Sequence, residues 1–332
     1  MKEQKEQREP VLLRPAAKDY LWGGSRLNDD YSKGIDVSPL AETWECSTHP
    51  DGVSTVASGI YTGRTLTELL HDHPDYLGTH PGAGEELPII VKFIDAKKDL
   101  SVQVHPDDEY ARVHENGQKG KTEMWYVIDA ARGASILYGF NADMTAETVR
   151  GRITDGTVMQ CLHRIDIKKD DVFFIPSGTV HAIGAGTLVA EIQENSNVTY
   201  RLYDYDRKDR NGQKRPLHID KALDVADLNR AGRPRQPLRV LRFRPGCATE
   251  LLSRCACFQV ERLLLNTEAT RHMPEFSADS ESFQVFLCVS GCGVMYWQGD
   301  MINFYQGDCI FVPASSIPFR LHGKAQFLKI NS

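Results

Sequence analysis

The chain has 332 residues, of which 41% are hydrophobic and 25% are charged, and its formal net charge is -6. This length and composition predict a soluble globular protein of about two domains with a sizeable core. The acidic balance and the lack of a dense Lys/Arg cluster argue against nucleic acid as a partner, because binding a phosphate backbone requires a basic face. A small anionic substrate, which needs only two or three local cations, remains compatible.

The N-terminal residues, the apolar runs and the cysteines indicate the cellular compartment. Residues 1–10 are charged throughout and have no apolar stretch, so they do not read as a signal peptide. No run reaches the roughly 18 to 20 apolar residues of a membrane span. Eight dispersed cysteines without a secretory context favour reduced thiols, and Cys255 and Cys257 are interpreted as buried strand residues. We therefore expect a cytoplasmic protein with no membrane partner and no obligate protein partner.

Taken in order, the chain reads mainly as short strands with a few capped helices. Thr65, followed three residues later by Glu68, predicts a short helix that ends before Pro74. Residues 41–47 are expected to form a half-buried edge strand that packs Trp44. Further strands are predicted over 88–95, 99–105, 124–129, 134–140, 170–175, 188–193 and 198–206, and further helices after Pro106, from Thr145 and over 218–228.

A Pro/Gly/Arg run at 229–237 is the best candidate linker. Beyond it, residues 307–313 resemble residues 169–176, so the second half reads as a repeat of the first. After Pro313, however, no histidine occupies the place that His181 has after Pro176. We expect a metal-binding catalytic domain over 1–230, a linker over 229–237, and a C-terminal domain over 238–332 that lacks the metal ligands.

The stretch from Leu100 to Val127 holds an unusual density of metal-ligand chemistry. Residues two apart on a strand point to the same face, so Gln103 and His105 project together. Glu123 opens the next strand-like run, 18 positions after His105. Because a helix fits between them, we expect these two strands to pair. Pro176 and Gly178 then make a turn that presents His181 at a defined place.

A Gln-x-His strand, a later Glu and a Pro-x-Gly-x-x-His turn resemble the two motifs of the cupin superfamily. Three or four nitrogen and oxygen ligands from adjacent strands suit a catalytic metal with an open position. Two histidines and one carboxylate also describe non-haem iron sites, and no thiolate is present to select zinc. The residue types alone therefore leave the metal open.

Residues 100–107, 121–126 and 195–207 together resemble the type I mannose-6-phosphate isomerase family in its short bacterial form, with similarity from about Trp22 to the C-terminus. The resemblance implies a mainly β fold of two cupin (jelly-roll) domains with a helical insertion. It also implies interconversion of mannose 6-phosphate and fructose 6-phosphate through an enediol. One zinc ion would be held by Gln103, His105, Glu123 and His181.

The resemblance further implies catalytic roles for Arg201 and Lys121, although Thr122 stands where many members of the family carry proline. Moving a proton between C1 and C2 requires an electrophile and a fixed cation beside the developing oxyanion. Ser101, Lys121 and Arg201 are the expected substrate contacts, and Lys92 is a further phosphate candidate. The general base stays open among a metal-bound water, Lys121 and the carboxylates of Glu191 and Asp204.

Two alternatives belong to other classes. An iron-dependent cupin dioxygenase is disfavoured by Gln103 as a fourth ligand, because such oxygenases keep positions free for oxygen. A non-catalytic sugar-phosphate-binding cupin would keep the metal and the pocket but would not turn substrate over.

Overall fold

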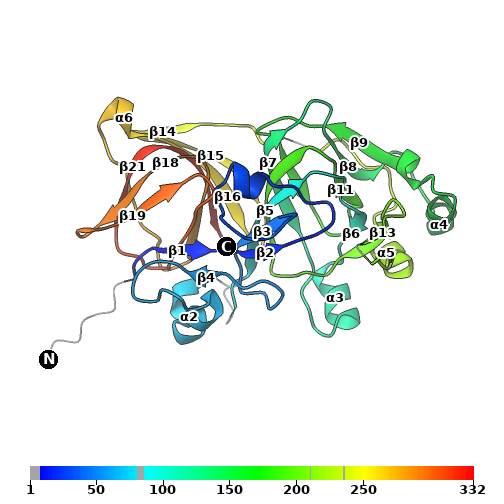
Figure 1. Cartoon of the computed structure of the whole chain (residues 1–332), viewed down its shortest axis with the longest axis horizontal. Coiled ribbons are helices and arrows are strands. Elements are labelled where there is room, and N and C mark those ends of the chain that lie inside the picture. Colours follow the sequence, from blue (N-terminus) through cyan, green and yellow to red (C-terminus); the bar gives the residue numbers. More distant parts are fainter. Residues whose placement is uncertain (1–7, 81–85, 210, 235) are drawn as a thin grey trace.

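The computed structural model describes residues 8–80, 86–209, 211–234 and 236–332. Over these residues the strands form three antiparallel sheets, and the helices are short. Figure 1 shows two β lobes side by side along the long axis, with the first strand, β1 (Val11–Arg14), lying in the lobe of the C-terminal strands. The prediction of a mainly β fold is confirmed.

Two of the sheets build the lobe that carries the predicted metal ligands. The six-stranded sheet has the order β10 (Val172–Ile175), β7 (Glu123–Ala130), β12 (Thr187–Glu194), β5 (Ile89–Ala96), β3 (Glu42–Cys46) and β2 (Ala16–Lys18). The five-stranded sheet has the order β13 (Tyr200–Tyr203), β6 (Val102–Val104), β11 (His181–Ile183), β8 (Ser135–Phe140) and β9 (Leu162–Asp166).

These two sheets face each other across one hydrophobic cluster. Trp125 and Val189 of the six-stranded sheet pack there with Ile136 and Ile183 of the five-stranded sheet. The other face of the five-stranded sheet is covered by helices α4 (Ala146–Thr154) and α5 (Ile219–Val225). The lobe is therefore a sandwich, and side chains that point inward from opposite sheets can meet in it.

The ten-stranded sheet forms the other lobe. Its main path is β14 (Arg242–Arg244), β15 (Cys247–Arg254), β16 (Gln259–Asn266), β21 (Phe319–Asn331), β18 (Gln284–Trp297), β20 (Cys309–Val312), β1 and β4 (Thr55–Val56); β17 (Glu275–Phe276) and β19 (Asp300–Tyr305) pair beside it. One cluster packs this sheet on the outer face of the six-stranded sheet, for example Val285 and Phe311 with Val91 and Ile192. The six-stranded sheet is thus buried on both faces.

The capped helices lie where their local sequence predicts. Helix α2 (Leu66–Asp72) carries the full capping box of Thr65 and Glu68, and Thr145 caps α4. Helix α3 (Asp108–His114) is capped by Asp107, whose side chain accepts from the Tyr110 amide. Helix α5 is shorter than the predicted 218–228. The short helices α1 (Arg26–Asp29) and α6 (Thr267–Thr270) and the 3₁₀ turns at Pro74–Leu77 and Val158–Cys161 complete the helical part.

Two expectations about strand pairing are wrong. The strand before His105, β6, pairs with β11 and β13, whereas Glu123 opens β7 in the other sheet, between β10 and β12. The strands meet face to face across the sandwich and not edge to edge, because the intervening helix carries the chain from one sheet to the other. Strand β3 is not an edge strand: it lies between β2 and β5, and all five of its residues are buried.

None of the described helices is long and apolar enough to cross a membrane. The domain boundary at 229–237 and the absence of a metal site from the C-terminal half stay predictions.

Candidate active site

Three of the predicted metal ligands meet inside the sandwich. His105 follows β6 directly, His181 opens β11 beside it, and Glu123 opens β7 in the facing sheet. One ligand atom from each lies within 4.8 Å of the others, and all three residues are buried. Antiparallel pairing places His181 opposite Gln103, the fourth predicted ligand. The structure therefore brings the whole predicted set together.

Hydrogen bonds to the backbone orient both imidazole rings. Nδ1 of His105 donates to the carbonyl of Val198 at 2.9 Å, and Nδ1 of His181 donates to the carbonyl of Thr179 at 2.8 Å. Each bond fixes the tautomer that leaves Nε2 without a proton. The two Nε2 atoms lie 3.2 and 3.6 Å from the carboxylate oxygens of Glu123, so three lone-pair donors converge.

The electrostatics favour the forms that bind a cation. Burial and the nearby Lys121 lower the pKa of His105 to about 3, and burial lowers the pKa of His181. Burial would raise the pKa of Glu123, but the neighbouring Lys121 and His105 outweigh it and hold that pKa well below its usual value. Neutral imidazoles and an ionised carboxylate are the states that metal ions require.

Three buried atoms of the cluster make no well-directed hydrogen bond to the protein. Nε2 of His105 and both carboxylate oxygens of Glu123 are buried without a well-directed hydrogen bond, although Lys121 Nζ lies 2.7 Å from Glu123 Oε1. Buried polar atoms are nearly always satisfied. The side-chain amide of Gln103 is 3.4 Å from His181 Nε2, and rotation of that amide can turn its oxygen to the same point. Two imidazoles, one carboxylate and one amide fit a divalent cation such as zinc.

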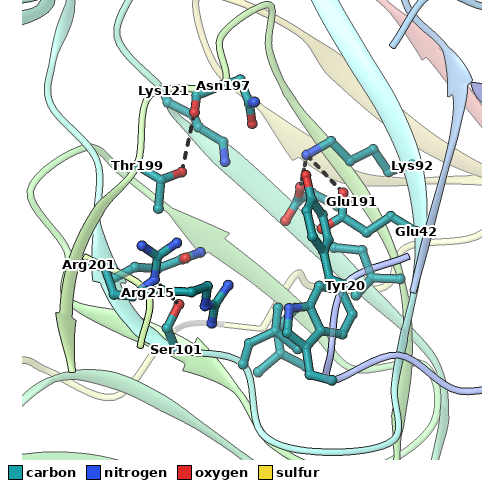
Figure 2. Close-up of a pocket in the computed structure, with 15 residues that line it drawn as sticks. Tyr20, Glu42, Lys92, Ser101, Lys121, Glu191, Asn197, Thr199, Arg201 and Arg215 are labelled. Carbon is teal, nitrogen blue, oxygen red and sulfur yellow. Dashed lines mark hydrogen bonds and ion pairs between the residues drawn. The ribbon is translucent and has the colours of Figure 1, made fainter. Parts of the chain in front are cut away.

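A pocket of about 240 Å³, drawn in Figure 2, adjoins this cluster through two of its lining residues, Gln103 beside His181 and Lys121 beside Glu123. Gln103 lines both the pocket and the cluster, and the predicted substrate residues Ser101, Lys121 and Arg201 line the pocket as well. Arg201 lies opposite Gln103 in the β13–β6 register, and its Nε donates to Ser101 Oγ at 3.3 Å. The residues expected to contact substrate are thus gathered in one place.

Two guanidinium groups stand on the same side of the pocket, as Figure 2 shows for Arg201 and Arg215. Burial and the proximity of Arg215 lower the pKa of Arg201, so both charges face the pocket at some electrostatic cost. Asp204 holds Arg215 through two hydrogen bonds of 2.8 and 2.7 Å and also pairs with Arg207. The Asp204 carboxylate, an open choice for the general base, is therefore committed to arginines.

The opposite side of the pocket is formed by residues whose roles the sequence analysis left open or did not assign. There Lys92 Nζ lies 3.0 Å from Glu191 Oε1 and 3.8 Å from Glu42 Oε2 (Figure 2). Lys92 was a phosphate candidate, but it is paired with two carboxylates. Tyr20 stands nearby, and burial together with the charge of Glu42 raises its pKa to about 12. No local motif in the sequence marks five further lining residues: Tyr20, Glu42, Asn197, Thr199 and Arg215. Only Glu42 lies on a strand, and the others reach the pocket from loops, so their place depends on the tertiary fold.

The chain is similar to known proteins over nearly its whole length. Residues 11–129 match the family model of the phosphomannose isomerase type I catalytic domain. The mannose-6-phosphate isomerase ManA of Bacillus subtilis is 39% identical over 321 residues, which cover 96% of this chain and 97% of that protein. The chain belongs to the mannose-6-phosphate isomerase family. The resemblance drawn from the motifs is thereby confirmed.

Other members of the mannose-6-phosphate isomerase family agree with this assignment. The enzyme of Streptococcus mutans is 43% identical over 222 residues, which cover 67% of this chain and 69% of that protein. A crystal structure of the mannose 6-phosphate isomerase from Bacillus subtilis superposes with a TM-score of 0.88 at 35% identity and covers 97% of this chain and 99% of that one. A zinc-bound mannose 6-phosphate isomerase has the same fold, with a TM-score of 0.74 at 15% identity over 97% of this chain and 98% of that one.

Proposed function

We propose that this protein is a zinc-dependent aldose–ketose isomerase that interconverts mannose 6-phosphate and fructose 6-phosphate. The observation that carries the proposal is the junction of a buried His105–Glu123–His181 cluster with a pocket that holds two arginines. Relatives that match nearly the whole chain bear the name mannose-6-phosphate isomerase. Cytoplasmic location and the absence of protein and nucleic-acid partners stay predictions.

Gln103, His105, Glu123 and His181 would hold the zinc ion. When bound, zinc supplies a Lewis acid that polarises the substrate carbonyl and stabilises negative charge on its oxygen. The protein's part is to keep the donors oriented, and hydrogen bonds to backbone carbonyls do this for the two histidines. Lys121, at 2.7 Å from Glu123, is placed to donate a hydrogen bond to a substrate oxygen at the same spot.

Arg201, Arg215 and Ser101 are proposed to bind the anionic oxygens of the substrate. Guanidinium groups pair with phosphate through short charge-assisted hydrogen bonds, and a hydroxyl adds a further donor. Arg201 also adjoins Gln103 in the strand register, so it can reach an oxyanion that develops near the metal ligands. The pocket thus has a cationic side for the substrate and a carboxylate side opposite.

Glu191 is proposed to move the proton. It lines the pocket, and burial together with the charge of Glu123 raises its pKa, which suits a carboxylate that must both take and return a proton. Glu191 takes the proton from C2, and the C–H electron pair forms the C1–C2 double bond. The carbonyl electron pair moves to the C1 oxygen, which takes a proton from the Lys121 ammonium to give the enediol. Glu191 then returns its proton to C1 while O2 gives its proton back to Lys121, and the ketose forms with no net change in protons.

The test is formation of fructose 6-phosphate from mannose 6-phosphate by the purified protein, before and after chelation. Activity should be lost with the metal and return when zinc is restored. Activity that survives complete metal removal would contradict zinc dependence. Unphosphorylated mannose is the matched control substrate and should react poorly because the arginines gain no partner. Iron in the protein with substrate-dependent oxygen uptake would instead support the oxygenase alternative.

A further inference from the structure

Four side chains form a row across the six-stranded sheet. The register places Trp125 on β7 opposite Glu191 on β12, Glu191 opposite Lys92 on β5, and Lys92 opposite Trp44 on β3. Residues opposite one another in neighbouring strands share a face, so the row stands on one side of the sheet. Glu42, two residues before Trp44, points to the same side.

Each member of the row is held by its neighbour. The indole nitrogen of Trp125 donates to Glu191 Oε2 at 2.9 Å, and that of Trp44 donates to Glu42 Oε2 at 2.7 Å. Lys92 Nζ donates to Glu191 Oε1 at 3.0 Å and lies 4.7 Å from the centre of the Trp44 ring. One ammonium therefore serves two carboxylates, and each carboxylate is fixed by an indole.

A contribution to folding stability does not explain why these three charged side chains are buried together. Lys92 is 3% exposed, Glu191 is 4% exposed and Glu42 is 8% exposed, so three charges are taken from water. Buried ion pairs contribute little net stability against their desolvation cost, and here the group carries one uncompensated negative charge. All three residues line the pocket. Functional sites accept this desolvation cost when supporting hydrogen bonds are needed to hold a side chain in one orientation.

We propose that Lys92, held by Glu42 and the Trp44 ring, is a positioning residue that fixes the Glu191 carboxylate for proton transfer in the pocket. The inference rests on the proposed function, since it assumes that Glu191 carries the proton. On this proposal Lys92 is not a phosphate contact. Its ammonium group is already paired with Glu191 and Glu42, across the pocket from Arg201 and Arg215.

The inference has a pH consequence. The charged groups that face Glu191 are Lys92 on β5, Glu42 on β3, and Glu123 with Lys121 at the start of β7. Without Lys92, Glu191 keeps two carboxylate neighbours and loses a cation, so its pKa rises. The enzyme would then need a higher pH to have Glu191 ionised. The acid limb of the pH profile of kcat/KM should move to higher pH.

The experiment measures kcat, KM and the pH profile of the zinc-loaded Lys92→Met enzyme. A mispositioned base costs roughly 100-fold in kcat, while KM should change by no more than about threefold, since substrate binding lies on the opposite wall. Lys92→Arg keeps the charge and should restore the acid limb toward its original pH. Glu42→Gln, which removes no cation, should lower kcat by about tenfold and move the limb to lower pH.

The chain offers a matched control in a buried Lys–Glu pair outside the pocket, Lys33 and Glu45, which lie 2.7 Å apart. Lys33→Met should weaken folding but leave kcat and the acid limb unchanged. A folded Lys92→Met enzyme with unchanged kcat and limb would overturn the positioning role. A rise in KM with kcat unchanged would overturn it too and make Lys92 a substrate contact.

Glu42→Gln keeps the test open if Lys92→Met does not fold: unchanged kcat in that variant would equally overturn the proposal. A zinc-loaded wild-type protein that does not isomerise mannose 6-phosphate would refute the proposed function itself and this inference with it. The two failures are distinguished by the wild-type rate alone.

Discussion

Arg201 shows how a single residue can be assigned from its surroundings. On a strand followed by Asp204 and Asp206 it could have been a structural ion-pair partner. The structure gives Asp204 to Arg207 and Arg215, and Asp206 to Lys214. Arg201 instead donates to Ser101 and to the carbonyl of Pro216 at 3.0 Å, which leaves its charge without a carboxylate partner among these neighbours. A half-buried cation without a carboxylate partner suits an anionic ligand.

We predict that Arg201→Met lowers kcat/KM for mannose 6-phosphate by about 100- to 1,000-fold, because one charge-assisted contact to an oxyanion is lost. Initial rates measured over a range of substrate concentrations check this. Arg164→Met is the matched control: Arg164 is exposed on β9 of the same sheet, away from the pocket, and its loss should leave kcat/KM unchanged. Equal values of kcat/KM for wild type and Arg201→Met would show that Arg201 neither binds the substrate nor takes part in catalysis.

At the scale of an element, the segment that carries Lys121 depends on one glycine. Gly120 is buried against the start of α3, where its amide donates to Asp108 Oδ1 at 2.8 Å. A Cβ at this position would lie 2.4 Å from the backbone carbonyl carbon of Asp107 and 2.5 Å from the amide nitrogen of Asp108. These backbone atoms cannot move away as a flexible side chain could. The close approach of residue 120 to the start of α3 therefore requires glycine.

We predict that Gly120→Ala costs about 1–3 kcal/mol in the free energy of unfolding, through overpacking, and lowers kcat by at least tenfold through displacement of Lys121. Urea unfolding and steady-state rates measure the two effects. Gly151→Ala is the control, since Gly151 lies inside α4 with nothing within 4 Å of an added Cβ. That change should be neutral or stabilise by about 0.4–1 kcal/mol. A Gly120→Ala enzyme with wild-type rates would mean that the segment adapts.

Helices and strands that are marked by a short sequence motif were predictable from the sequence. Which strands pair with or face one another was not. The capping box of Thr65 and Glu68 lies within one turn, so its helix could be placed from a few residues. The predicted ligand set, which the structure brings together, was likewise drawn from motifs. The facing of β6 and β7 across the sandwich, and the row from Trp125 to Trp44, depend on long-range register. No short pattern specifies register between strands far apart in sequence, because it is decided by the packing of both faces.

On the scale of the whole molecule, the two lobes are joined by packing of the ten-stranded sheet on the six-stranded sheet, and one buried ion pair lies at this joint. Lys33 Nζ is 2.7 Å from Glu45 Oε2 on β3 and also donates to the carbonyl of Gly307, between β19 and β20, at 2.5 Å. The same ammonium lies 5.1 Å from the centre of the Phe93 ring on β5. One side chain therefore links both sheets.

We predict that Lys33→Met lowers the free energy of unfolding by about 3–5 kcal/mol, because the fully buried Glu45 carboxylate loses its partner. Burial already raises the pKa of Glu45, and removal of the cation raises it further, so the carboxylate takes up a proton more readily and part of the loss should be recovered at lower pH. The double change Lys33→Met with Glu45→Gln removes the buried charge and should recover most of the stability at neutral pH. Urea unfolding of the three proteins at two pH values measures each step, and a double variant as unstable as Lys33→Met would show that the lysine acts through its bond to Gly307.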